Sequence, residues 1–538
     1  MKKTVFFLLL LMLCAAFSHA CADGGPCGVH AEWTLSADGV LTISGTGPMD
    51  DFQTASDMPW KGVRDKIKSV VIEEGITTIG DDAFYACADL TSVTLPESLR
   101  IIGDAAFESC KALTSITIPD GVLSIGRAAF AFCAGLTEFQ LPASVEAIDE
   151  QAFYKCTGLT AVTLPDTLKY IGPLAFQGCT ALTGIAIPAS VSFISERDAF
   201  TDCKSLQEIT ADPANADYAS VDGVLFNKDQ SRLLYYPAGK TDASYTVPET
   251  VTSINDRAFA SNASLVSLTI PGSAETIGSG AFSGCGSLEQ IPLPEGIRSI
   301  GDEAFVGCRK LTELSVPASL IFLGADPFRD CFSLTSISAA EGSELLSSAD
   351  GVLFSADKTV LRAYPPAKAG DTYAVPDGVK KIADDAFAGC EALVSVTFPE
   401  SLQEIGIRAF CECPSLTDLT LPEGLLSIAD GAFAGCPGPA ALVIPKTVDI
   451  IGYDVFSDCE NLAEVTFLNP ATDLSEAYSA FDGCADGLTF FGPEGSTAEA
   501  YAEENGIPFS VPEVPDEVEE LAPARKERPG SVSPVTVP

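Results

Sequence analysis

The sequence predicts a repeat solenoid, a fold in which short coils of similar length stack along one axis. The phrase Ala-Phe-x-x-Cys recurs every 23 residues, first at Phe84 and Cys87, and a fixed period of roughly 20 to 50 residues is typical of solenoids. Apolar residues follow each cysteine at the spacing of a short strand, as at Leu90, Val93 and Leu95. At 538 residues the chain also exceeds the size to which one compact core usually grows. We therefore expect a one-dimensional stack of coils.

Each 23-residue coil is predicted to have two different sides. The apolar spacing after the cysteine matches the leucine-rich signature L-x-x-L-x-L, which predicts a β-strand on one face. Pro96 ends this strand because proline has no N–H for the ladder. Residues 99–102 cross the other face, and Gly103 begins a short helical, 3₁₀ or extended segment that buries Phe107. One coil cannot bury so many apolar groups alone, so neighbouring coils must supply the core.

Two longer coils interrupt the series. We place these variant inserts at about residues 207–250 and 335–378, and the step between the flanking phenylalanines is 59 residues in both cases. Each insert contains an Asp-Gly pair between apolar residues, at Asp222 and at Asp350, which is a strong signal for a β-hairpin. The same order of elements occurs twice, which indicates tandem duplication of a block of 128 residues.

The ends of the chain differ from the repeats. An Asp-Gly hairpin at Asp38 precedes the first coil, and near the other end a helical pattern stops at Gly506. Solenoids need their exposed ends covered, so both segments are predicted to be caps. The mature chain is then divided into an N-terminal β cap at 21–66, the solenoid at 67–492, a C-terminal cap at 493–511 and a disordered tail at 512–538.

Residues 1–20 have the features of a secretory signal peptide. Two lysines precede an apolar run over residues 5–17, and a small-x-small cleavage site ends at Ala20. We therefore expect a secreted protein or one on the extracellular surface, with no membrane span in the mature chain. Cys21 follows the cleavage site, so lipid anchoring there is an alternative, although the upstream residues do not match a lipid-modification box.

Fourteen of the 18 cysteines occupy the same position of the repeat. In a stack they would form a ladder with neighbouring Cα atoms about 4.8 Å apart and parallel Cβ directions. Buried thiols that bond to the backbone are therefore favoured over disulfides, which stay the alternative in an exported protein. Asn262 replaces one of these cysteines and can satisfy the same backbone groups. Cys21 and Cys27 could close a small loop.

Composition argues against several functions. The formal net charge of −43 makes nucleic acid an unfavourable partner because of plain repulsion. After removal of the signal peptide His30 is the one histidine left, so no Ser-His-Asp or Cys-His constellation is expected. Cys411 and Cys413 are the nearest approach to a zinc pair, and Cys413 belongs to the ladder. We predict no enzyme activity, no metal and no cofactor; an acid-pair glycoside hydrolase is a distant alternative.

A row of short polar residues is predicted to point outward from the strands. These positions lie between the two inward residues of each strand, and the ones proposed to bind a partner are Thr94, Thr117, Gln140, Thr163, Thr397 and Thr420. A protein or glycan could lie along such a surface and gain affinity from many weak contacts. The alternative is that threonine simply suits an exposed strand.

The inserts carry a second set of candidates. Tyr235, Tyr236 and Tyr364 are candidate binding residues because tyrosine is a frequent interface anchor. Tyrosine also packs a β-ribbon onto its solenoid, and the sequence favours this second interpretation.

Several phrases together resemble a known family. Leu-Thr-Ser-Val-Thr-Leu-Pro at 90–96, Ile-Gly-Asp-x-Ala-Phe at 102–107 and Asp-Gly-Val-Leu-Phe at 222–226 are similar to those of the BspA-like leucine-rich repeat proteins of bacteria, over about residues 27–510. The resemblance implies a surface or secreted protein that adheres to host proteins or neighbouring cells and is not an enzyme. We therefore expect an exported, monomeric adhesin that recognises a macromolecule, with a glycan-binding module as the alternative.

Overall fold

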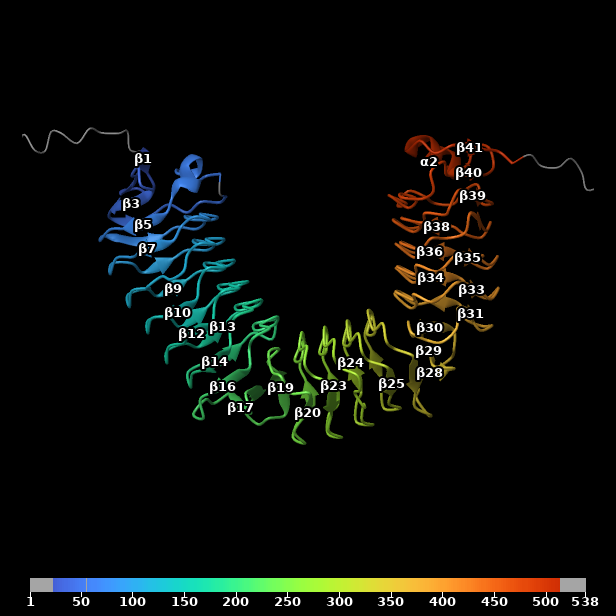
Figure 1. Cartoon of the computed structure of the whole chain (residues 1–538), viewed down its shortest axis with the longest axis horizontal. Helices are drawn as coiled ribbons and strands as arrows, with labels where there is room; N and C mark the ends of the chain where they lie inside the picture. Colours follow the sequence, from blue (N-terminus) through green and yellow to red (C-terminus); the bar gives the residue numbers. More distant parts are fainter. Residues whose placement is uncertain (1–22, 55, 513–538) are drawn as a thin grey trace, which may run out of the picture.

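The computed structural model describes residues 23–54 and 56–512. Figure 1 shows coils stacked side by side along a wide arc, with β1 (Asp23–Pro26) at one tip and α2 (Thr497–Asn505) at the other. The predicted repeat solenoid with 23-residue coils is confirmed. The predicted signal peptide at 1–20, Cys21 and residues 513–538 of the predicted tail lie outside the described residues.

Most coils contribute one strand to each of two rows. The first row follows the cysteine of each coil and comprises β7 (Ser92–Thr94), β10 (Glu138–Gln140), β12 (Ala161–Thr163), β14 (Gly184–Ile187), β16 (Glu208–Ala211), β20 (Ser244–Thr246), β22 (Ser267–Thr269), β25 (Glu313–Val316), β27 (Ser336–Ala339), β31 (Thr372–Ala374), β33 (Ser395–Thr397), β35 (Asp418–Leu419), β37 (Ala441–Ile444) and β39 (Glu464–Phe467). The second row has two residues per strand and comprises β8 (Ile101–Ile102), β9 (Ser124–Ile125), β11 (Ala147–Ile148), β13 (Tyr170–Ile171), β15 (Phe193–Ile194), β21 (Ser253–Ile254), β23 (Thr276–Ile277), β24 (Ser299–Ile300), β26 (Phe322–Leu323), β32 (Lys381–Ile382), β34 (Glu404–Ile405), β36 (Ser427–Ile428) and β38 (Ile450–Ile451).

Where neighbouring coils pair within a row, they pair in parallel and in register, although each row is divided into several sheets. Phe139 of β10 faces Val162 of β12, and Ile148 of β11 faces Ile171 of β13. Each residue therefore lies beside its counterpart of the next coil, and identical side chains form ladders along the arc. Alternation explains which ladders are inside: Phe139 is buried, whereas its neighbour Gln140 is exposed.

The segment that joins the second row to the next coil is a series of tight turns. Tyr85 N donates to Asp82 O and Cys87 N donates to Phe84 O, which are bonds of the 3₁₀ type. φ is positive at Asp82 (55°), where the first of these turns begins, and at Ala86 (54°), inside the second, so the segment does not continue as a helix. The backbone also bonds to the next coil, as from Phe84 N to Ala106 O at 2.8 Å.

The repeat phenylalanines form columns of parallel rings inside the stack. Neighbouring rings lie 5.3 Å apart between Phe84 and Phe107 and 5.4 Å apart between Phe107 and Phe130. The first column runs from Trp60 to Phe200, the second from Tyr236 to Phe328 and the third from Tyr364 to Phe481, where consecutive rings are stacked throughout. The aromatic core is thus divided at the two inserts.

The repeat cysteines line this core as free thiols, which confirms the predicted ladder. Cys110 Sγ donates to Phe84 O at 3.2 Å and Cys133 Sγ donates to Phe107 O at 3.1 Å. Burial raises the pKa of the Cys133 thiol to about 12, so it stays protonated and keeps its hydrogen bond. Asn262 is buried at the cysteine position and donates instead to three insert carbonyls, including Lys240 O at 3.1 Å.

The predicted hairpins of the inserts are confirmed. The first insert contains β17 (Tyr218–Val221), β18 (Val224–Asn227) and β19 (Arg232–Tyr235), and the second contains β28 (Leu346–Ala349), β29 (Val352–Ser355) and β30 (Val360–Ala363). Each set is antiparallel internally, and its last strand joins the second row in parallel.

Each insert forms a wall between two hydrophobic cores. In the first insert, Leu225 and Tyr235 pack into the preceding core, whereas Phe226, Leu233 and Tyr236 pack into the following one. This division follows from strand alternation, because successive side chains point to opposite faces. The solenoid therefore consists of three cores separated by two walls.

Further strands and helices lie at the two ends of the described chain. Near the N-terminus the described elements are β2 (Ala31–Leu35), β3 (Val40–Gly45), β4 (Gly47–Pro48), the 3₁₀ helix η1 (Lys61–Lys66), β5 (Ser69–Ile72) and β6 (Ile76–Ile79), and near the C-terminus they are β40 (Thr489–Phe491), α2 and β41 (Phe509–Ser510). The hairpin of β2 and β3 extends the first row, because β3 pairs with β5 in parallel. Ser496 caps α2, and Gly506 ends it in the left-handed region at φ 70°.

Candidate binding surface and insert junctions

The six polar positions proposed from the sequence are all exposed. Thr94, Gln140, Thr163 and Thr397 end strands of the first row, while Thr420 follows β35 directly. Thr117 differs from expectation, because residues 113–119 of its coil form no strand. The first row is interrupted there, between β7 and β10.

These positions fall into two groups. Thr94, Thr117, Gln140 and Thr163 lie on four successive coils, and Gln140 pairs directly with Thr163 across the ladder. The other two, Thr397 and Thr420, lie on two successive coils near the opposite tip. Figure 1 places β7, β10 and β12 on one arm of the arc and β33 and β35 on the other. A partner that touches one group therefore need not reach the other.

The polar atoms of this surface are free to meet a partner. Over residues 23–54 and 56–512, no side chain of the six positions forms a hydrogen bond within the chain. Neighbouring threonines behave differently: Thr160 Oγ1 donates to Thr137 O at 2.9 Å, one coil earlier. We refer to Thr94, Thr117, Gln140, Thr163, Thr397 and Thr420 as the polar row. An unpaired hydroxyl or amide on a rigid ladder offers hydrogen bonds at little cost in ordering.

The three tyrosines proposed as binding residues are buried and do not lie on the outer surface, which corrects their proposed role as exposed interface anchors. Tyr235, Tyr236 and Tyr364 have exposed fractions of 5%, 2% and 4%. Tyr235 ends β19, while Tyr236 and Tyr364 directly follow β19 and β30, and their rings pack into the hydrophobic cores beside the insert walls. They pack the inserts onto the solenoid, as the second sequence interpretation has it.

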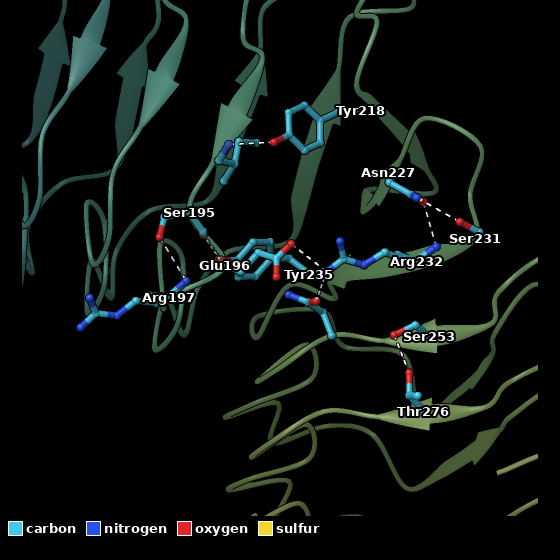
Figure 2. A network of polar contacts seen from close by, with 12 residues as sticks. Ser195, Glu196, Arg197, Tyr218, Asn227, Ser231, Arg232, Tyr235, Ser253 and Thr276 are labelled. Atoms are coloured by element: carbon cyan, nitrogen blue, oxygen red, sulfur yellow. Dashed lines mark hydrogen bonds and ion pairs between the residues drawn. The ribbon is translucent and has the colours of Figure 1, made fainter. Parts of the chain in front are cut away.

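Tyr235 anchors the first wall to the preceding coil. Its ring meets Phe200 edge to face at 5.3 Å, so it joins the first aromatic column to the insert. Its hydroxyl donates to Ser195 O at 2.8 Å and accepts from Ala199 N at 3.3 Å. Figure 2 shows this phenol beside Ser195, with Tyr218 reaching the same region from β17. The backbone O of Ser195 and the backbone N of Ala199 thereby each have a hydrogen-bond partner inside the core.

Charged groups at the rim of this first junction reinforce it. Arg232 Nη2 donates to Glu196 Oε1 and to Asn255 Oδ1, both at 2.7 Å (Figure 2). Arg257 forms an ion pair with Asp198 at 3.2 Å. The first wall is therefore attached by an aromatic ring, by phenol hydrogen bonds and by ion pairs.

The second wall lacks these attachments. The two blocks align with an offset of 128 residues, so Ala363 is the equivalent of Tyr235. By the same offset, Leu346 and Val360 are the equivalents of Tyr218 and Arg232. Among the described residues no aromatic contact joins Phe328 to Tyr364. A cleft of about 350 Å³ opens at this junction, whereas the matching space beside Tyr235 measures about 10 Å³.

The charges at the second junction are also rearranged. Asp326 corresponds to Asp198, but its neighbour is Asp385 where the first block has Arg257. Burial, followed by the adjacent Asp385, raises the pKa of Asp326 to about 6. Asp385 itself is held by Arg408, whose Nε donates to Oδ1 at 3.0 Å. Asp326 is thus a carboxyl group without the counter-ion that its first-block equivalent has.

This carboxyl pair does not match the geometry of a glycoside hydrolase. Asp326 and Asp385 are close enough to share a hydrogen bond, whereas glycosidase carboxyl groups stand about 5 Å apart or more to flank a sugar bond. His30 is exposed in the N-terminal segment. Within residues 23–54 and 56–512, no three His, Cys, Asp or Glu side chains gather as a metal site.

Sequence reasoning missed the cleft at the second wall. The signal was present, because aligning the two 128-residue blocks places Ala363 opposite Tyr235 and Asp385 opposite Arg257. Each difference alone is an ordinary substitution in a repeat protein. Their effect on one junction is visible only when the fold brings residues 326, 363 and 385 together.

Comparisons with known proteins agree with the fold. The model of the BspA type leucine rich repeat region matches with six copies, over residues 63–146, 123–222, 239–349 and 371–486. A search of curated protein sequences finds no match. No helix in the described part of the chain is both long and apolar enough for a membrane span.

Three solved structures illustrate the likeness. A leucine rich cell surface protein from Faecalibacterium prausnitzii is 28% identical, with a TM-score of 0.51, over 71% of this chain and 96% of that chain. The pneumococcal vaccine antigen PcpA is 20% identical, with a TM-score of 0.50, over 86% and 99%. A leucine-rich repeat protein from Eubacterium ventriosum is 26% identical, with a TM-score of 0.48, over 78% and 95%. Since the family model covers more than half of the residues, the chain belongs to the BspA type leucine-rich repeat family.

Proposed function

We propose that the chain is an exported, nonenzymatic adhesin that binds a macromolecule through the polar row. The observation that carries this proposal is the polar row itself: short side chains, exposed and unpaired, repeat at fixed spacing on a rigid ladder. Family membership supports a surface protein-binding role, and so does the likeness to a bacterial cell surface protein.

The physical features of the row favour an extended partner. Successive coils repeat the same position, so a protein strand or a glycan chain can make the same small contact several times. Each contact is weak, but little conformational entropy is lost because Thr94, Gln140, Thr163 and Thr397 lie in paired strands. The net charge of −43 favours a partner that is neutral or basic.

A binding array tests this proposal with the full chain as the probe. Purified extracellular-matrix proteins, bacterial surface proteins and polysaccharides are immobilised, and bound chain is quantified at two salt concentrations. We expect saturable binding to one class of protein. Binding to glycans alone would instead support the glycan-binding alternative.

Catalysis is tested with the same panel. Release of sugar fragments from any polysaccharide, abolished by a single carboxylate substitution such as Asp326→Asn, would overturn the nonenzymatic proposal. We expect no turnover, because Asp326 and Asp385 are too close together to flank a glycosidic bond.

A further inference from the structure

The junction between the second insert and its preceding coil contains a cleft. At the equivalent junction of the first block, the ring of Tyr235 fills this space. In the first block the phenol of Tyr235 occupies this space against Phe200. In the second block Phe328 stands in place of Phe200, and Ala363 leaves the space open. The chain therefore shows directly that an aromatic ring fits between a repeat phenylalanine and the insert wall.

The walls of the cleft suit such a ring. Leu323, Phe328, Leu353 and Tyr364 contribute apolar surface, and all four side chains are almost completely buried. The volume of about 350 Å³ falls in the range of small-molecule sites. Burying a phenyl ring against these residues would stabilise a complex through the hydrophobic effect and through edge-to-face contact with Phe328.

The charges that line the cleft specify the rest of the ligand. Asp326 faces Asp385, which replaces the arginine of the first block. The nearby Arg329 pairs with Glu303 at 3.0 Å, and among the described residues Asp326 forms no ion pair. Arg362 replaces Leu234 and brings a guanidinium group to the same cleft. Among the described residues, Arg362 forms no ion pair or side-chain hydrogen bond. An acid that forms no ion pair and a base that forms no side-chain contact of this kind therefore both line the cleft.

We propose that this cleft binds a free aromatic amino acid. The ring occupies the space that Tyr235 fills in the first block, the ammonium group pairs with Asp326, and the carboxylate pairs with the fork of Arg362. The ligand supplies the two groups that the second junction lacks, namely an aromatic ring and a cation. This site is distinct from the polar row and does not depend on the adhesin proposal.

The test measures binding of 4-fluoro-L-phenylalanine to the full chain by fluorine NMR. We expect saturable binding of one equivalent, displaced by L-phenylalanine and L-tyrosine. 4-Fluorophenethylamine lacks the carboxylate and 3-(4-fluorophenyl)propionate lacks the ammonium group, so each should bind at least tenfold more weakly. Absence of saturable binding would overturn the proposal, and equal binding of the amine would overturn the assignment to an amino acid.

Variants locate the site. Ala363→Tyr places the first-block ring into the cleft and should reduce affinity at least tenfold, and Asp326→Asn should do the same by removing the anion. If Ala363→Tyr does not fold, the affinity of Asp326→Asn for the fluorinated ligand alone tests the location of the site. Tyr235→Ala is the matched control, because it opens space in the first block but keeps Leu234 and Arg257; it should add no second site. Unchanged affinity in Asp326→Asn would place binding elsewhere and contradict the proposal.

Discussion

Replacing Tyr235 should weaken the first junction and separate the unfolding of the coils on its two sides. The side chain has an exposed fraction of 5%, contacts Phe200 edge to face at 5.3 Å and bonds to Ser195 O and Ala199 N. Because a solenoid is stabilised by contacts between neighbouring repeats, this one residue controls one interface.

The expected magnitude follows from what each substitution removes. Tyr235→Phe keeps the ring but leaves Ser195 O and Ala199 N without their partner, which costs about 1–3 kcal/mol for buried polar groups. Tyr235→Ala also removes the ring, and truncation of a buried aromatic residue costs about 3–5 kcal/mol. Since Ala363 is the natural residue of the second junction, Tyr235→Ala should make the first junction resemble it.

Amide hydrogen exchange under increasing urea measures the effect coil by coil. We expect protection to fall mainly in residues 171–235, which contact the wall, and the single unfolding transition of this region to separate from that of residues 253–323. Tyr364→Phe is the matched control: its hydroxyl forms no hydrogen bond among the described residues, so the free energy of unfolding should change by less than about 0.5 kcal/mol. A uniform loss of protection along the chain, or equal effects of Tyr235→Phe and Tyr364→Phe, would refute this reasoning.

Three further predictions concern other parts of the chain. Thiol titration of denatured, unreduced protein should find the repeat cysteines free, while in the native protein the half-exposed Cys411 and Cys484 should react first; fewer than half of the repeat cysteines free would contradict the thiol ladder. Asp326→Asn should raise the free energy of unfolding by about 1 kcal/mol at pH 7.5, after allowance for solvent screening of a half-buried group, and by nothing below about pH 4. The sign follows from the raised pKa of Asp326: the folded state favours the protonated carboxyl, so its contribution to stability is present at low pH and is lost as pH rises through about 6. If urea unfolding shows equal effects of the substitution at both pH values, titration of Asp326 is not the cause. Ser496→Ala should destabilise the C-terminal helix by about 1 kcal/mol, since Ser496 Oγ accepts from Glu499 N, and helix-specific exchange rates that stay unchanged would show that the cap is dispensable.

Periodicity predicts most of this fold because every coil places the same types of residue at the same positions. The spacing of Phe107 and Cys110 predicts a buried ring and a buried thiol, and the structure shows the ring stacked on Phe84 and the thiol donating to Phe84 O of the preceding coil. Asp-Gly pairs locate three of the hairpins, β2–β3, β17–β18 and β28–β29, since they favour a tight turn between apolar strands. These features could be predicted because they depend on one turn or on equivalent residues of neighbouring coils, which the repeat places side by side.

Features that depend on distant residues were harder to predict. The exposure of the polar row follows from strand alternation, but Thr117 lies where the ladder is interrupted, and nothing in its own coil indicates this. The tyrosines of the inserts are typical of interfaces and of cores alike, and only packing between blocks decides that Tyr235 is buried. The cleft arises from substitutions at residues 326, 363 and 385, so it is a property of the junction and not of any motif.

The adhesin proposal is tested most directly by altering the polar row and measuring binding to the partner that the array identifies. Arginine at Thr94, Thr117, Gln140 and Thr163 leaves the buried ladder intact, because all four side chains are exposed. The control variant carries arginine at four exposed positions of or beside the second row, namely Ile101, Leu123, Ser124 and Phe193. We expect the polar-row variant to lose at least tenfold in affinity with an unchanged melting temperature, while the control binds as the natural chain does. Full binding by the polar-row variant, or an equal loss in the control, would contradict the assignment of function to this surface.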